Sequence, residues 1–93
     1  MAQFVASLMD AETGSDNKYE FEGPDDLLHK TPVRVIRHFM EIVDKEILPS
    51  EHIDYELNAA MRNKDVGVVT GIGSLIRENG GEIPFLLMIS KKR

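Results

Sequence analysis

One stretch of this sequence, Thr70-Gly71-Ile72-Gly73-Ser74, has the glycine-x-glycine step of a nucleotide-binding loop. In a dinucleotide-binding fold, that loop leaves a strand, opens a helix and places a third glycine or alanine three residues after the second. Here the third position is Ile76, and a helix after it would soon meet Asn79-Gly80-Gly81, which favours a turn. The spacing therefore predicts no nucleotide site, and we expect no cofactor.

The same glycines have a structural interpretation if residues 66–76 form a strand. Alternate residues of a strand face opposite sides, so Gly71 and Gly73 would share a face with Val69 and Leu75. Glycine inside a strand often marks a bend or a place where another backbone comes close. We expect a helix of the same chain, or a second subunit, to pack against this face.

Other side chains able to do chemistry are few and poorly spaced for it. The histidines His29, His38 and His52 match no metal-ligand spacing, and no cysteine is present to complete a zinc site. Ser74 lacks the Gly-x-Ser-x-Gly context of a hydrolase nucleophile. Asp25-Asp26 follows a Gly-Pro step, which favours a turn or a helix cap over a catalytic dyad. We expect no metal, name no catalytic residue, and favour a protein that is not an enzyme.

An inverted charge distribution marks the helix that is predicted to begin at Thr31-Pro32. Acidic side chains are favourable near a helix N-terminus and basic ones near its C-terminus. Two explanations for the inversion stay open: the loop acids Asp25 and Asp26 offset the positive charge, or an anion or acidic partner binds there. The candidate anion or partner site therefore consists of the basic residues at the helix start, Lys30, Arg34, Arg37 and His38, while Asp44 and Glu46 stand near its end.

The composition is that of one small folded domain spanning residues 1–93. Hydrophobic residues make up 42% of the chain and charged residues 29%, an ordinary balance for a globular protein. The formal net charge is −5, and the basic residues are scattered apart from Lys91-Lys92-Arg93, so we expect no nucleic-acid partner. No apolar run approaches the roughly 20 residues of a membrane span, and the N-terminal residues lack a signal-peptide pattern. We expect no membrane partner and a cytoplasmic location.

Hydrophobic periodicity predicts the element order ββαβββ. Alternating residues predict strands at 3–9 and 18–22, joined by the turn-rich segment 11–17. Thr31-Pro32 suits a helix start, and Leu48-Pro49 suits its end. Between them, apolar residues recur at helical spacing and form a broad stripe: Val33, Val35, Ile36, Phe39, Met40, Ile42, Val43 and Ile47.

The second half of the chain predicts three more strands. Residues 52–61 alternate as a strand, although the segment 51–62 also contains strong helix formers, and both interpretations stay open. Residues 66–76 and 83–90 complete a meander. The sequence thus predicts an α+β fold: a mainly antiparallel sheet of about five strands with one long helix packed on one face.

A single helix leaves the other face of such a sheet uncovered. The strand at 83–90 is apolar on both sides, so the face turned away from the helix should carry exposed hydrophobic area. We expect self-association, as a homodimer, to cover it. The predicted interface residues are Leu86, Met88, Val69 and Leu75.

These features favour a non-catalytic, homo-oligomeric binding or regulatory module. The alternative is a small enzyme or ligand binder that uses Arg34, Arg37 and His38 on a carboxylated or phosphorylated molecule. A concave pocket lined by those three side chains would favour the alternative.

Overall fold

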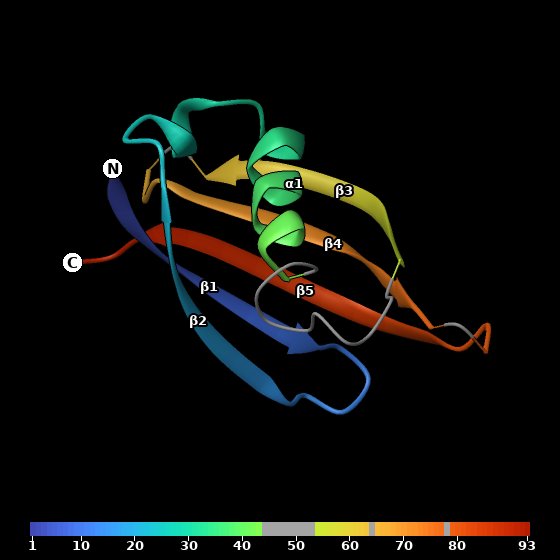
Figure 1. Cartoon of the computed structure of the whole chain (residues 1–93). Coiled ribbons are helices and arrows are strands. Elements are labelled where there is room, and N and C mark those ends of the chain that lie inside the picture. Colours follow the sequence, from blue (N-terminus) through green and yellow to red (C-terminus); the bar gives the residue numbers. More distant parts are fainter. Residues whose placement is uncertain (44–53, 64, 78) are drawn as a thin grey trace.

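The computed structural model describes residues 1–43, 54–63, 65–77 and 79–93. Five antiparallel strands form one sheet in the order β2-β1-β5-β4-β3, and one α-helix lies across a single face of it (Figure 1). The predicted α+β fold and its order of elements are confirmed. The elements are β1 (Ala2–Asp10), β2 (Asp16–Gly23), the short 3₁₀ helix η1 (Leu27–His29), α1 (Pro32–Ile42), β3 (Asp54–Asn63), β4 (Val68–Ile76) and β5 (Glu82–Lys91).

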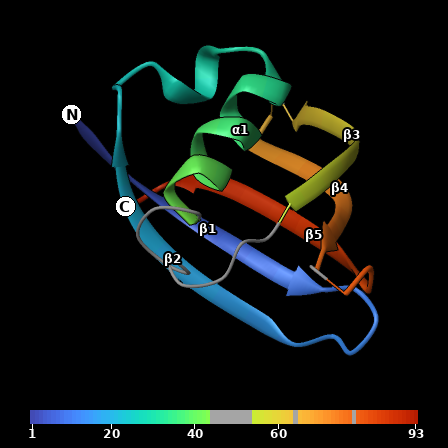
Figure 2. The same ribbon diagram turned by 45° about the vertical axis from the view of Figure 1, so that its right-hand side comes forward.

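The strands on either side of α1 in the chain lie at opposite edges of the sheet. The β1–β2 hairpin leaves β2 at one edge and β3 lies at the other, and α1, which comes between them in the chain, packs on one face of the sheet (Figure 2). The meander β3-β4-β5 then returns and pairs β5 with β1. No described helix has the length and apolar character needed to cross a membrane.

The helix begins where the sequence predicts. Thr31 is the N-cap and Pro32 the first helical residue, a position where the missing N–H of proline costs nothing. The hydroxyl of Thr31 makes no capping hydrogen bond, so the proline carries the start signal. Val33, predicted to lie in the apolar stripe, is 41% exposed. The predicted end at Leu48-Pro49 lies outside the described residues.

The hydrophobic core lies between α1 and the sheet. Phe21 of β2 is central to it, because its ring lies 5.6 Å from that of Phe4 and 5.4 Å from that of Phe39, between ring centroids. Such aromatic contacts add to the stabilisation from buried area. The buried apolar residues are Phe4, Ala6, Phe21, Leu27, Val35, Ile36, Phe39, Met40, Val43, Val69, Phe85, Leu87 and Ile89.

A β-bulge changes the predicted alternation in β3. Leu57 pairs with Gly73 and Ala59 with Ile72, which leaves Asn58 as an extra residue in the strand. The predicted uninterrupted alternation over residues 52–61 is therefore wrong beyond Leu57. Tyr55, Leu57 and Ala60 pack toward α1, while Ala59 and Met61 are exposed. Residues 54–63 are strand, and His52 and Ile53 lie outside the described residues.

The glycines of β4 make room for neighbouring groups on the helix side. A Cβ on Gly71 would lie 2.8 Å from Cδ1 of Ile36 in α1. A Cβ on Gly73 would collide with the backbone carbonyl oxygen of Glu56, next to the bulge, and would lie 3.0 Å from Cζ of Phe85. The glycine-x-glycine step therefore sits in the middle of a strand, where close packing requires it, and not at a strand-to-helix turn.

The two glycines differ in the kind of obstacle that they face. The end of the Ile36 side chain can rotate away from an added methyl group, whereas the Glu56 carbonyl belongs to the backbone. We expect Gly73→Ala to lower the free energy of unfolding by about 2–3 kcal/mol and Gly71→Ala by about 1 kcal/mol. Urea denaturation measures both values. Ser74→Ala, on the opposite face of the same strand, is the control, and equal costs at the two glycines would contradict this explanation.

Candidate functional site

The basic residues predicted to hold an anion diverge around the start of α1. Arg37 lines a shallow hollow on the side of β3, with Val33 and Tyr55 among its neighbours. His38 lines a different hollow, on the side of β2. Arg34 is exposed and lines neither of these two. Among the hollows formed by the described residues, none brings Arg34, Arg37 and His38 together.

Of the two explanations for the inverted helix charges, neutralisation by loop acids has no ion pair to support it in the described part of the chain. Neither Asp25 nor Asp26 forms an ion pair with Lys30 or Arg34 there. The backbone carbonyl oxygen of Lys30 accepts a hydrogen bond from the guanidinium of Arg62 in β3. The start of α1 is thus linked to β3 through the backbone of Lys30 and not through the charged side chain of Lys30.

His38 packs as an aromatic side chain. Its ring lies 6.1 Å from that of Phe21, between centroids, at the border of the core. Nε2 of His38 is buried and has no hydrogen-bond partner among the described residues. A buried polar atom without a partner lowers stability. The His38 ring therefore contributes to packing against Phe21. Its Nε2 atom makes no hydrogen bond with the described residues.

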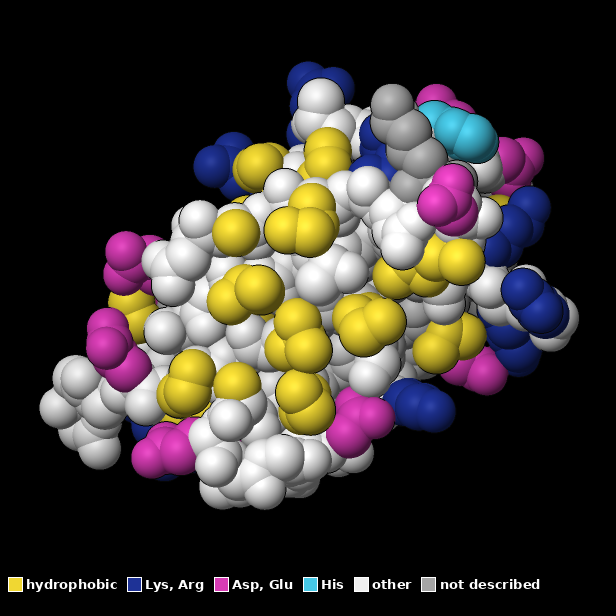
Figure 3. All heavy atoms as spheres, turned by 180° about the vertical axis from the view of Figure 1, so that it is seen from behind, with side chains coloured by type: hydrophobic (Ala, Val, Ile, Leu, Met, Phe, Trp, Pro, Cys, Tyr) yellow, Lys and Arg dark blue, Asp and Glu magenta, His cyan; other side chains and the backbone are white. Residues whose placement is uncertain are grey.

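The face of the sheet turned away from α1, which we call the open face, carries a broad apolar surface. Figure 3 shows hydrophobic side chains gathered across its middle. Met61, Ile72 and Met88 are among the most exposed large hydrophobic residues, at 56%, 45% and 43%. The apolar residues of this face are Val5 and Met9 from β1, Pro84, Leu86 and Met88 from β5, Val68, Ile72 and Ile76 from β4, and Ala59 and Met61 from β3.

Strand register aligns these side chains across the sheet. Met9 pairs with Leu86, Leu86 with Ile72, and Ile72 with Ala59, which makes one apolar row over four strands. The next row, Ser7-Met88-Thr70-Met61, alternates small polar side chains with the two methionines. Side chains opposite each other on neighbouring strands lie about 4.5–5.5 Å apart at Cβ, so the first row is a continuous apolar ridge with Met88 and Met61 beside it.

The predicted interface residues divide between the two faces. Leu86 and Met88 lie in the middle of the open face, as expected. Val69 is fully buried and Leu75 packs against the core, both on the helix side, so neither belongs to an interface on the open face. Strand alternation could have identified the interface residues of β4. Because α1 covers the face that bears the glycines, the residues that alternate with them must lie on the open face, and these include Val68, Ile72 and Ile76.

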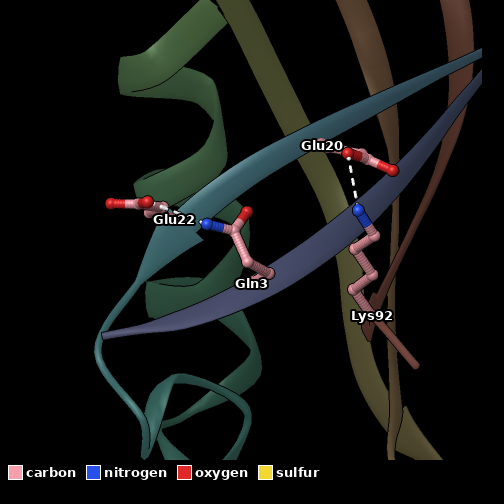
Figure 4. A network of polar contacts seen from close by, with 4 residues as sticks. All are labelled: Gln3, Glu20, Glu22 and Lys92. Carbon is pink, nitrogen blue, oxygen red and sulfur yellow. Dashed lines mark hydrogen bonds and ion pairs between the residues drawn. The ribbon is translucent and has the colours of Figure 1, made fainter.

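Polar and charged side chains border the apolar surface along the edge strands. Figure 4 shows two contacts of this border: Nε2 of Gln3 donates to Oε1 of Glu22 at 2.8 Å, and Nζ of Lys92 lies 3.0 Å from Oε2 of Glu20. An apolar centre with a polar rim is the usual anatomy of a protein–protein interface. The charged residues of this rim are Asp16, Lys18, Glu20 and Glu22 on β2, and Asp54 and Glu56 on β3.

Neither a metal cluster nor a known relative directs the functional assignment. Within the described ranges, no three His, Cys, Asp or Glu side chains gather closely enough to hold a metal ion. Comparison of the chain with protein-family models, curated proteins and solved structures gave no match. The open face is therefore the candidate functional site, on the strength of its own geometry.

The unpaired nitrogen of His38 provides a test of how this residue is used. His38→Leu keeps an apolar contact with Phe21 and removes the unpaired atom. We expect the free energy of unfolding to stay unchanged or to rise by up to about 1 kcal/mol, as measured by urea denaturation. The same change at the exposed His29 is the control and should have no effect. A loss of stability in His38→Leu alone would contradict the expectation that removal of the unpaired nitrogen offsets the lost ring contact.

Proposed function

We propose that this protein is a binding module without catalytic activity of its own, and that it works as a homodimer joined through the open face. The observation that carries this proposal is the apolar surface centred on Leu86, Met88 and Ile72. Large exposed apolar patches with a polar rim mark interaction sites in soluble proteins. A second copy of the sheet would bury it as one layer of a sandwich, with the sheets about 10 Å apart.

The distribution of charge along the strands supports a second copy as the occupant. One end of the sheet, beside the β1–β2 and β4–β5 turns, is acidic. At the opposite end, where β5 stops, several Lys and Arg side chains gather beside acidic ones, as Figure 3 shows at the right-hand side. At the first end lie the acidic residues Asp10, Glu12, Asp16, Asp54, Glu56 and Glu82 together with Arg77, and at the second lie Arg62, Lys91, Lys92 and Arg93 together with Glu20, Glu22 and Asp65. The polarity is therefore clearest along β5, which starts at Glu82 and is followed by Lys92.

This polarity selects one orientation for the dimer. A two-fold axis parallel to the strands would set like ends against each other. An axis in the plane of the interface but perpendicular to the strands reverses the strand direction, so the acidic start of β5 meets the basic residues that end β5 in the other copy. If that axis passes beside Leu87, in the middle of β5, Glu82 comes over Lys92 of the partner subunit because both lie five positions from it.

The alternative, a small enzyme or ligand binder at the helix start, has less support because its basic side chains point into separate hollows. The cytoplasmic location also stays a prediction from the sequence, and fractionation of cells that produce a tagged chain would test it.

The assembly is tested by placing charge in the middle of the open face. We expect the parent protein to have the mass of a dimer by light scattering after size exclusion, and Leu86→Glu with Met88→Glu to yield a folded monomer. Val33→Glu, at an exposed apolar residue of α1, is the matched control and should stay dimeric. A monomeric parent protein, or a folded double variant with the parent mass, would exclude this interface.

The orientation is tested by exchanging the charge at the start of β5 with the charge just after its end. Glu82→Lys alone and Lys92→Glu alone should each raise the dimer dissociation constant about twofold to tenfold, because like charges then meet across the interface. The variant that carries both changes should return toward the parent value. Analytical ultracentrifugation at low salt measures all four proteins. A double variant weaker than either single variant would contradict the perpendicular axis.

A further inference from the structure

A hollow at the end of the sheet where β5 stops combines apolar and basic side chains. It is separate from the two hollows beside α1 that Arg37 and His38 line. It lies where β5 ends and β4 begins, next to η1, and these segments lie at the left in Figure 1. We call it the end hollow. Its volume of about 890 Å³ falls within the roughly 300–1,000 Å³ of small-molecule sites.

One wall of the end hollow is apolar and is held by an ordered turn. Val66 is 66% exposed, an unfavourable position for a large apolar side chain. The turn around it is fixed, because the N–H of Gly67 donates to the carbonyl oxygen of Asn63 at 2.9 Å and the N–H of Asp65 donates to Oδ1 of Asn63 at 3.1 Å. Val66 is therefore presented at the hollow beside the other apolar lining residues, Val5, Leu28 and Val68.

The rest of the wall is basic, and no acidic residue of the described chain lines it. The whole chain contains 16 acidic residues against 11 Lys and Arg, so this is a marked local departure from its overall charge. The charged residues that line the hollow within one chain therefore all favour an anion, although Glu20 pairs with Lys92. The basic lining residues are Arg62, Lys91, Lys92 and Arg93, with His29 beside them.

Arg62 is positioned before any ligand arrives. Its Nε donates to the carbonyl oxygen of Leu28 at 2.9 Å, and its Nη2 donates to that of Lys30. A guanidinium has five N–H donors in a planar fork, so these contacts orient the group and leave donors free. Lys92 is in an exposed ion pair with Glu20, which is a weak interaction. Lys91 and Arg93 have no acidic partner within ion-pair distance among the described residues.

We propose that the end hollow binds an anion that carries an apolar body. A carboxylate or phosphate head would lie against Arg62, Lys91 and Arg93, and a hydrocarbon chain would cover Val66 and Val68. This inference goes beyond the proposed dimer, although the two sites border each other, because Val5 and Val68 also belong to the open face. The basic side chains favour an anionic head group on the ligand, and the exposed apolar wall favours a hydrocarbon body.

The test is a titration of the ¹⁵N-labelled chain with four probes: decanoate, decyl phosphate, inorganic phosphate and the neutral amphiphile octyl glucoside. We expect saturable binding of at least one of the two decyl anions, with amide shifts centred on residues 65–69 and on Arg62. Inorganic phosphate and octyl glucoside should each bind at least about tenfold more weakly, because each supplies only one half of the recognition. The tighter of the two decyl anions identifies the head group.

Variants locate the contacts. Lys91→Gln with Arg93→Gln should weaken binding of the tighter decyl anion by about tenfold, through loss of charge-assisted hydrogen bonds. Val66→Ser should weaken it by about fivefold, since the body loses apolar contact. Arg34→Gln with Arg37→Gln removes the same charge at the helix start and serves as the matched control, with unchanged affinity expected.

Three results would overturn the proposal: no saturable binding of either decyl anion, equally tight binding of inorganic phosphate or octyl glucoside, or a loss of affinity in the helix-start variant while the Lys91 and Arg93 variant keeps it. The same titrations on the Leu86→Glu, Met88→Glu variant separate this site from assembly. They report ligand contact, whereas light scattering reports mass, so the two proposals can fail independently.

Discussion

The contact between Ile36 and the bare backbone at Gly71 determines how close α1 comes to the sheet. A strand with side chains at every position would hold a helix further away, but β4 has no Cβ where Ile36 lies. The close approach lets Phe39 and Val35 reach the core from the same helix. It also assigns the faces of the sheet, because the side of β4 that bears glycine becomes the covered side.

Covering one face leaves the other without a partner in the same chain. Residues that alternate with the glycines of β4, such as Ile72, must then lie on the open face beside Leu86 and Met88. In the proposed dimer, this surface is the inner layer of a sandwich. Val5 and Val68 belong both to the border of the open face and to the proposed ligand site, so ligand binding and dimer formation would be thermodynamically linked. A ligand that strengthens or weakens the dimer must bind the dimer more tightly or more weakly by the same factor.

The bulge at Asn58 connects the edge of the sheet to the proposed ligand site. Without the extra residue, Met61 would point toward α1 and Arg62 would point away from it. With it, Met61 joins the open face and Arg62 reaches the carbonyl oxygens of Leu28 and Lys30. One additional residue thus places an apolar group on the interface and a guanidinium at the end hollow.

The sequence alone determined most of the elements and their order, because the periods of strands and helices are local properties of the backbone that a few residues reveal. Residues 51–62 fitted both a strand and a helix, and only the structure showed residues 54–63 as strand. Thr31-Pro32 marked the helix start, and Gly71 and Gly73 indicated close packing. Tertiary structure decided which face of β4 is covered, where the bulge shifts the register of β3, and that residues as distant as Val5, Arg62 and Lys91 line one hollow. These features depend on contacts between segments far apart in the chain, and a local pattern is the same whichever partner the strand finds.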